Sequence, residues 1–322
     1  MTTSLSAKIA PIVAALCLIF VPALSSAASG PDLAGARGAL NSGHANDAIS
    51  ALQKILSSNP RNTAAHNLLC RVEYQEQRWA DAAHECETAV QQQPNNSEFH
   101  NWLGRAYGAQ AERASKFSAF GLAKKVHAEF QTAAKLDPHN VDALSNLAEF
   151  AVEAPGFLGG GLDQAQAIAT QMKSLNAEKY HSLLASIAMK KKDTATAERE
   201  LKASVAQAKE PARAWMNLAS FYAKTGNPQA MMQAMQSSIA ADKKNSSVLV
   251  DGAFLVHKQN PALAEQLLRK YLASSHPSED APVFQVHEHL GQLLEHQGNK
   301  AAAQQEYAAA HALATDYVMD KH

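Results

Sequence analysis

A pattern of 34 residues repeats along this chain and is most regular between Thr63 and Asn96. That segment holds two stretches with a helical spacing of apolar residues, a turn at Gln77–Trp79, and Pro94 near its end. In an array of such units each unit packs only on its neighbours, so the core grows with the number of units. The repeat therefore predicts an all-α stack of helical hairpins.

Large, small and aromatic residues recur at fixed offsets in the pattern, and the sixth unit shows them at Trp215, Leu218, Ala219, Tyr222 and Gly226. This arrangement resembles that of tetratricopeptide repeats. The resemblance covers most of residues 29–322, is weakest in the seventh unit, and implies a right-handed α-solenoid of about eight hairpins. The expected units lie near residues 30–62, 63–96, 97–140, 141–177, 178–211, 212–245, 246–283 and 284–317.

Two units depart from the period. The third is ten residues longer than the repeat, because residues around 110–121 are added while the helical spacing continues. We expect a projecting hairpin with Phe117 and Phe120 near its tip, either packed on each other or exposed as a contact. In the fourth unit residues 153–162 replace the turn, and Gly159–Gly161 form either a shaped surface loop or an anion-binding nest of amides. No Lys-Ser or Lys-Thr follows these glycines, which excludes a P-loop.

Residues 1–28 have the pattern of a secretory signal peptide. Lys8 is the only charge, an apolar run covers residues 12–24, and small residues fill positions 25–28. The run is short for a membrane span, and an uncleaved membrane anchor is the alternative. Removing these residues takes away one lysine and no acid, which changes the net charge from −1 to −2. We therefore expect an exported protein, periplasmic or secreted, with no membrane span after cleavage.

Two cysteines remain after cleavage, Cys70 and Cys86, on opposite sides of the turn in the second unit. Each lies eight residues from Arg78, so they face each other across the predicted hairpin. An oxidising compartment would favour a disulfide between them. The alternative is a pair of small, buried, apolar residues where the two helices approach closely.

The charge balance and the motifs exclude several classes of function. Lys and Arg together number 29 against 30 Asp and Glu, and no long basic run is present, so nucleic-acid binding is not expected. The sequence HEHLG at residues 287–291 lacks the His-Glu-x-x-His pattern of a zinc site. A nucleophile elbow and a phosphate-binding motif are also missing. We expect a non-catalytic protein without a metal or cofactor.

In tetratricopeptide repeats the first helix of each unit lines a concave groove that binds peptides. Arginines recur at position nine of the first three units, in two steps of 34 residues, and asparagines recur nearby. The resemblance implies that these side chains bind an acidic or C-terminal peptide segment, because Arg pairs with carboxylates and Asn with peptide groups. The lysines of the known carboxylate clamps are absent. The candidate groove residues are Arg37, Asn67, Arg71, Asn101, Arg105 and Asn146.

The repeat array is typical of an interaction module, so the leading hypothesis is an adaptor of the cell envelope that holds a partner peptide. The alternative is a structural subunit that self-associates. Only residues 318–322 follow the last unit, where an additional covering helix is usual. The last apolar face is therefore either capped by polar residues or docked on a second subunit, which would give a homo-oligomer through the C-terminal end.

Overall fold

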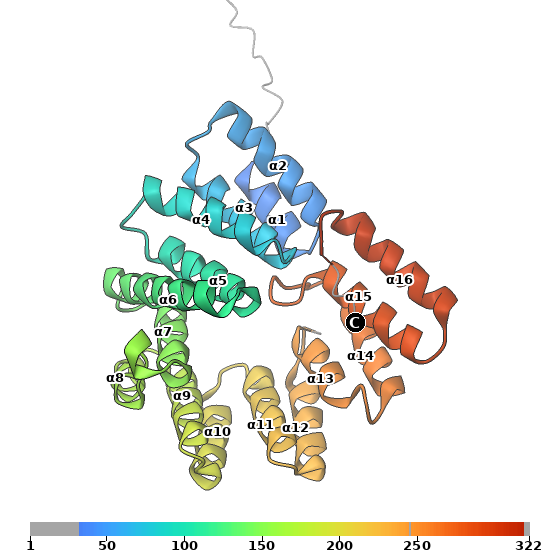
Figure 1. Cartoon of the computed structure of the whole chain (residues 1–322). Coiled ribbons are helices and arrows are strands. Elements are labelled where there is room, and N and C mark those ends of the chain that lie inside the picture. The colour runs from blue at the N-terminus through green and yellow to red at the C-terminus, as the bar shows by residue number, and fades with distance from the viewer. Residues whose placement is uncertain (1–31, 245, 319–322) are drawn as a thin grey trace, which may run out of the picture. The chain divides into compact units, whose positions relative to one another are not determined.

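The computed structural model describes residues 32–244 and 246–318, so the expected signal peptide lies outside the described residues. The described residues form α-helices, one short 3-10 helix and no strand beyond an isolated bridge (Figure 1). The α-helices are α1 (Leu33–Asn41), α2 (Ala45–Ser58), α3 (Thr63–Gln75), α4 (Trp79–Gln92), α5 (Ser97–Arg113), α6 (Lys116–Leu136), α7 (Val141–Glu153), α8 (Leu162–Met172), α9 (Ala177–Lys190), α10 (Thr194–Gln207), α11 (Ala212–Lys224), α12 (Pro228–Ala241), α13 (Val248–Val256), α14 (Pro261–Leu272), α15 (Val283–His296) and α16 (Lys300–Leu313).

Consecutive helices pack in pairs, α1 with α2 through α15 with α16. In several units an asparagine caps the N-terminus of the first helix. The Oδ1 atoms of Asn62, Asn96 and Asn140 accept hydrogen bonds from backbone amides in the first turns of α3, α5 and α7. Glycine brings paired helices close together, since a Cβ on Gly104 would lie 2.5 Å from the Phe130 ring. The predicted all-α solenoid of helical hairpins is confirmed.

The additional residues of the third unit lengthen both of its helices. Helix α5 has 17 residues and α6 has 21, against 13 and 14 in α3 and α4. Phe117 is 95% exposed, so of the two alternatives the packing of Phe117 and Phe120 on each other is wrong and the exposed arrangement is the one observed. Phe120 instead stacks on Phe157, with ring centroids 6.1 Å apart.

Residues 153–162 form a fixed turn around the 3-10 helix η1 (Gly156–Leu158). The amides of Gly159, Gly160 and Gly161 donate to the carbonyl oxygens of Gly156, Pro155 and Ala151. Because these amides already have acceptors inside the turn, they are not available as an anion-binding nest. The shaped surface loop is the alternative that the structure supports.

The first and last hairpins share a hydrophobic core, which we call the end contact. It combines residues of α1, α2 and α3 with residues of α15, α16 and the segment after α16. Phe284 is fully buried there, and its ring packs edge-on against Tyr317 with centroids 4.9 Å apart. The apolar face at the C-terminal end is therefore covered by the chain's own first units. Neither polar capping nor a second subunit is needed to cover it.

Polar groups fix the register of the end contact. Asn46 bonds the segment after α16 in both directions: its Nδ2 donates to the Ala312 carbonyl at 3.0 Å, and its Oδ1 accepts from the Thr315 amide at 3.0 Å. The backbone approaches closely at Gly43, whose φ of +69° is in the left-handed region. A Cβ there would lie 2.4 Å from the Val283 nitrogen. Glycine is thus required at this position by both conformation and space.

Buried carboxyl groups lie beside the end contact at the end of α3. Burial raises the pKa of Glu73 to about 8 and that of Glu76 to about 7, and the charge of Arg78 opposes both shifts. The Arg78 guanidinium lies 3.7 Å from Glu73 Oε1 and 3.8 Å from Asp316 Oδ2, so it connects this cluster to the C-terminal segment. At neutral pH the folded chain therefore holds a proton on Glu73 that the unfolded chain has lost.

We predict that Gly43→Ala lowers the thermal midpoint more than Gly226→Ala. Gly226 has a φ of +76° but no atom within 4 Å of an added Cβ. Both variants bear the cost of a left-handed alanine, about 1 kcal/mol. Only Gly43→Ala also clashes with the last hairpin. If calorimetry showed the same decrease in thermal midpoint for both variants, the end contact would be contradicted.

Stability should fall as pH rises from about 4.5 to about 8. The folded-state pKa of Glu73 lies above its unfolded value, so ionisation favours the unfolded chain over this window. Glu73→Gln should be more stable than the wild type at pH 9 by about 1 kcal/mol or more, with a smaller difference at pH 4. Urea unfolding at both pH values, with the exposed Glu210→Gln as control, measures this. If the difference in unfolding free energy between Glu73→Gln and the wild type were the same at both pH values, the raised pKa of Glu73 would be refuted.

Candidate functional site

A cavity of about 1050 Å³ lies along the first helices of the second to fifth units. Its wall comes mainly from α3, α5 and α7, with Lys179 of α9 and two acidic residues, Glu279 and Asp280, from the segment between α14 and α15. The sequence analysis predicted a groove along these first helices of the units. Four of the six candidate groove residues line it: Arg71, Asn101, Arg105 and Asn146.

An aromatic cluster lies beneath both arginines of the cavity, and the Arg71 guanidinium is 4.8 Å from the centroid of the Trp102 ring. Tyr74 packs edge-on against both Trp79 and Trp102, at centroid distances of 5.0 and 5.8 Å. The Arg105 guanidinium lies over the Trp102 ring, 3.9 Å from its centroid, and 5.3 Å from the centroid of Tyr74. Such cation–π contacts hold a guanidinium in place without neutralising its charge. Arg105 is thus a fixed, charged group in the cavity wall.

Arg71 is already paired within the chain. Its Nε and Nη2 donate to the two carboxylate oxygens of Glu279 at 2.9 and 2.5 Å, and its Nη1 donates to Glu98 at 3.1 Å. Burial disfavours the charged form, but these carboxylates outweigh burial and raise the pKa of Arg71. The bidentate geometry expected for a partner carboxylate is therefore occupied by a residue 208 positions further along the chain. A partner carboxylate would have to displace Glu279.

The asparagines bond one another rather than facing a ligand freely. Asn146 Nδ2 donates to Asn101 Oδ1 at 2.8 Å, which joins α5 to α7. Asn67 is buried outside the cavity, and its Nδ2 has no hydrogen-bond partner among the described residues. Asn101 and Asn146 thus position the wall, while Asn67 does not line it.

Arg37 was expected to continue the row of arginines, and this expectation is wrong. Arg37 is exposed on α1 and does not line the cavity. The segment before α15 and the first turn of α15 lie against α3. Gln75 Nε2 donates to the Glu279 carbonyl at 3.1 Å, and Gln285 Nε2 donates to the Gln75 carbonyl at 2.6 Å. These contacts end the cavity at the second unit.

Carboxylates dominate the cavity. Seven acidic side chains line it against three basic ones. Burial raises the pKa of Glu149, while the nearby charges of Lys179 and Arg105 act to lower it. Glu112, Asp142 and Asp280 form no ion pair with the described residues. The sequence did not single out these carboxylates, because nothing local in the sequence places them on one wall.

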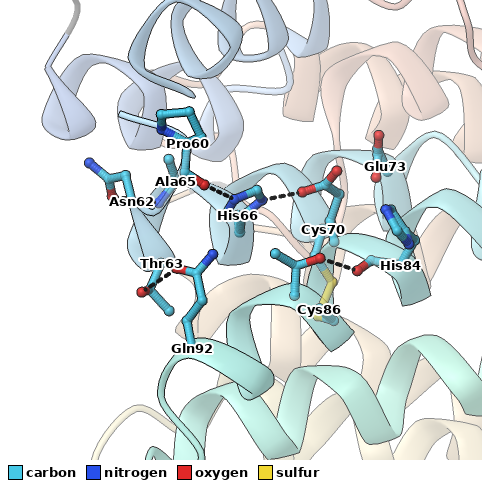
Figure 2. A network of polar contacts seen from close by, with 12 residues as sticks. Pro60, Asn62, Thr63, Ala65, His66, Cys70, Glu73, His84, Cys86 and Gln92 are labelled. Carbon is cyan, nitrogen blue, oxygen red and sulfur yellow. Dashed lines mark hydrogen bonds and ion pairs between the residues drawn. A yellow bond between two sulfur atoms is a disulfide. The ribbon is translucent and has the colours of Figure 1, made fainter. Parts of the chain in front are cut away.

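Next to the cavity, α3 and α4 are tied together by covalent and polar contacts (Figure 2). Cys70 and Cys86 are joined by a disulfide with their Cα atoms 5.3 Å apart. His66 Nε2 lies 3.0 Å from the Pro60 carbonyl oxygen, and its Nδ1 lies 2.6 Å from Glu85. The same histidine–glutamate pair joins the helices of three other units, at His100–Glu129, His181–Glu200 and His287–Glu306.

The sequence analysis missed these histidine pairs, although a signal was present. In three of the four units the glutamate follows the histidine by 19 residues, and in the lengthened third unit by 29. Each pair crosses between the two helices of one hairpin, so the pairs are internal fasteners of the repeat. None of them lines the cavity.

Among the described residues, no group of three or more His, Cys, Asp or Glu side chains is arranged to hold a metal ion. None of the described helices has the length and apolar character needed to cross a membrane.

Comparison with protein families gives two matches, each to a model described as a tetratricopeptide repeat. One match covers residues 39–112 and the other residues 182–246. No catalytic family is indicated. No curated protein sequence matches this one.

Several solved structures are similar. Yeast Tom70 matches with 16% identity and a TM-score of 0.53, over 84% of this chain and 55% of that one. A thermophilic TPR protein from Thermus thermophilus matches with 19% identity and a TM-score of 0.47, over 55% of this chain and 90% of that one. A tetratricopeptide repeat protein from Parabacteroides merdae matches with 12% identity and a TM-score of 0.47, over 83% and 92% of the two chains.

The likeness to Tom70 concerns the fold alone, and this chain spans little more than half of that structure. The two family matches include all of the second and sixth units, in which the residue signature is clear. Together with sixteen described α-helices that pack in pairs, they show that the chain contains tetratricopeptide repeats.

Proposed function

We propose that this protein is an exported scaffold that binds a segment of a partner protein in the cavity lined by α3, α5 and α7. Tetratricopeptide repeats are in general protein-interaction scaffolds, and the cavity lies on the helices that line the groove in that family. The observation that carries the proposal is a cavity with an aromatic-backed wall and with carboxylates that form no ion pair among the described residues.

The charges of the cavity favour a partner segment with cationic side chains, in place of the acidic segment expected from the sequence. Seven carboxylates face three cations, and Arg71 is neutralised by Glu279. An acidic segment would meet Glu112, Asp142 and Asp280 without enough free cations to offset them. Lysine or arginine side chains of a partner would pair with these three carboxylates, and complementary charge sets both specificity and association rate.

Export is supported by two observations on the chain. Residues 1–28 have the composition of a signal peptide. The disulfide between Cys70 and Cys86 is of a kind that persists in oxidising compartments and is rare in the cytosol of mesophiles. A periplasmic or secreted location therefore forms part of the proposal.

Binding of labelled Gly-Ser peptides that carry either four lysines or four glutamates tests the charge of the partner. We expect the lysine peptide to bind residues 29–322 more tightly, in a salt-dependent way. Glu112→Lys and Asp280→Lys should each weaken its binding by about three- to tenfold, while Glu210→Lys, which changes the net charge equally outside the cavity, should not. Fluorescence anisotropy measures the affinities. Preferential binding of the glutamate peptide would contradict the proposal.

The export proposal predicts a mature chain that begins near residue 29 and carries no free thiol. The mature protein isolated without reductant should not react with an alkylating agent at Cys70 or Cys86. The disulfide spans 16 residues of sequence, so its reduction should cost about 3 kcal/mol of stability. Mass spectrometry and urea unfolding with and without reductant measure both. Two alkylated cysteines would refute the oxidised state.

A further inference from the structure

The two irregular units of the array meet at one exposed aromatic patch. The lengthened helix α6 contacts the 3-10 helix η1 of the fourth unit. Phe117 is 95% exposed, Phe157 is 74% exposed, and Phe120 stacks on Phe157 while remaining 43% exposed. We call Phe117, Phe120 and Phe157 the tip patch. Large apolar side chains this exposed are uncommon as a contiguous group on a soluble protein and mark a contact surface.

The turn that carries Phe157 is built to sit against α6. A Cβ on Gly159 would lie 2.4 Å from the His127 ring, and the φ of Gly159 is +90°, so only glycine allows this approach. His127 in turn stacks on Phe150 of α7, with centroids 5.3 Å apart. Phe157 is therefore held in position by packing beneath it. Its exposure is a property of the folded array.

Cations accompany the tip patch along the chain. Residues 113–128 contain Arg113, Lys116, Lys124 and Lys125 and no Asp or Glu. The Lys124 ammonium lies over the Phe120 ring, 4.5 Å from its centroid. The next acidic residue along α6, Glu129, is hydrogen-bonded to His100. The patch is thus apolar at its centre and cationic at its edge, which is the complement of an anionic lipid surface.

We propose that the tip patch docks the protein reversibly on an anionic membrane surface, with Phe117 and Phe157 inserted at the headgroup level and Lys116 and Lys124 against the lipid phosphates. None of the described helices is long and apolar enough to span a bilayer. The proposed contact is made by the tip patch at the membrane surface. Three aromatic rings and a few lysines give a weak attachment that depends on salt and on lipid charge. The cavity between α3 and α7 is not part of this surface.

Co-sedimentation of residues 29–322 with vesicles tests the proposal. We expect binding to vesicles of phosphatidylglycerol and phosphatidylcholine, and much less to phosphatidylcholine alone. The double variant Phe117→Ser, Phe157→Ser should lower binding about tenfold. Phe254→Ser, which removes an exposed phenylalanine outside the tip patch, should leave binding unchanged. Lys116→Glu with Lys124→Glu should lower binding to anionic vesicles only.

Two results would overturn the proposal. One is absence of wild-type binding to anionic vesicles at low salt. The other is equal binding by the wild type and the double phenylalanine variant. Light scattering of the wild type and the double variant tests whether a second copy of the chain covers the patch instead. If the wild type binds no vesicles but self-associates, and the variant does not self-associate, the patch is a contact between two copies. The lysine-peptide affinity should be the same in the wild type and the double variant, so a failure here is separable from a failure of the cavity proposal.

Discussion

The contact between the first and last hairpins is the constraint on which the other features depend. A repeat array leaves an apolar face at each end, and each face has to be covered or made polar. Here Phe284 and Tyr317 of the last unit share a core with Leu40 and Leu52 of the first. The two ends cover each other, so no additional covering helix is required within the described residues. The segment between α14 and α15 is thereby brought against α3.

That placement determines the chemistry of the cavity. Glu279 reaches Arg71 because the last unit is packed on the first, and the same segment brings Asp280 to the cavity wall. Without Glu279 and Asp280 the wall would carry five acidic side chains against three basic ones, and with them it carries seven against three. Arg105 keeps its charge on the aromatic cluster, and the disulfide in the second unit fixes the hairpin that holds Arg71. The N-terminal units thus serve both as a binding wall and as a receptor for the chain's own C-terminal segment.

The fold could be predicted from the sequence because its signals are local. The period, the asparagine caps and the small residues at helix contacts all lie within one unit, and the lengthened hairpin follows from counting residues. The pairing of Arg71 could not be predicted, because Arg71 and Glu279 are 208 residues apart and no pattern links them. The position of Phe157 against Phe120 depends in the same way on packing between two units. Local periodicity therefore predicts the hairpins, whereas contacts between distant units determine what their surfaces present.

The central claim is that the two ends of the array are in contact in solution. It is tested most directly by a distance between α2 and α16. Spin labels at Asp47→Cys and Ala312→Cys flank the bonds that Asn46 makes to Ala312 and Thr315. Dipolar electron paramagnetic resonance on the oxidised mature protein should give one short, narrow distance distribution. A broad distribution at long distance would show an open array and would contradict the account.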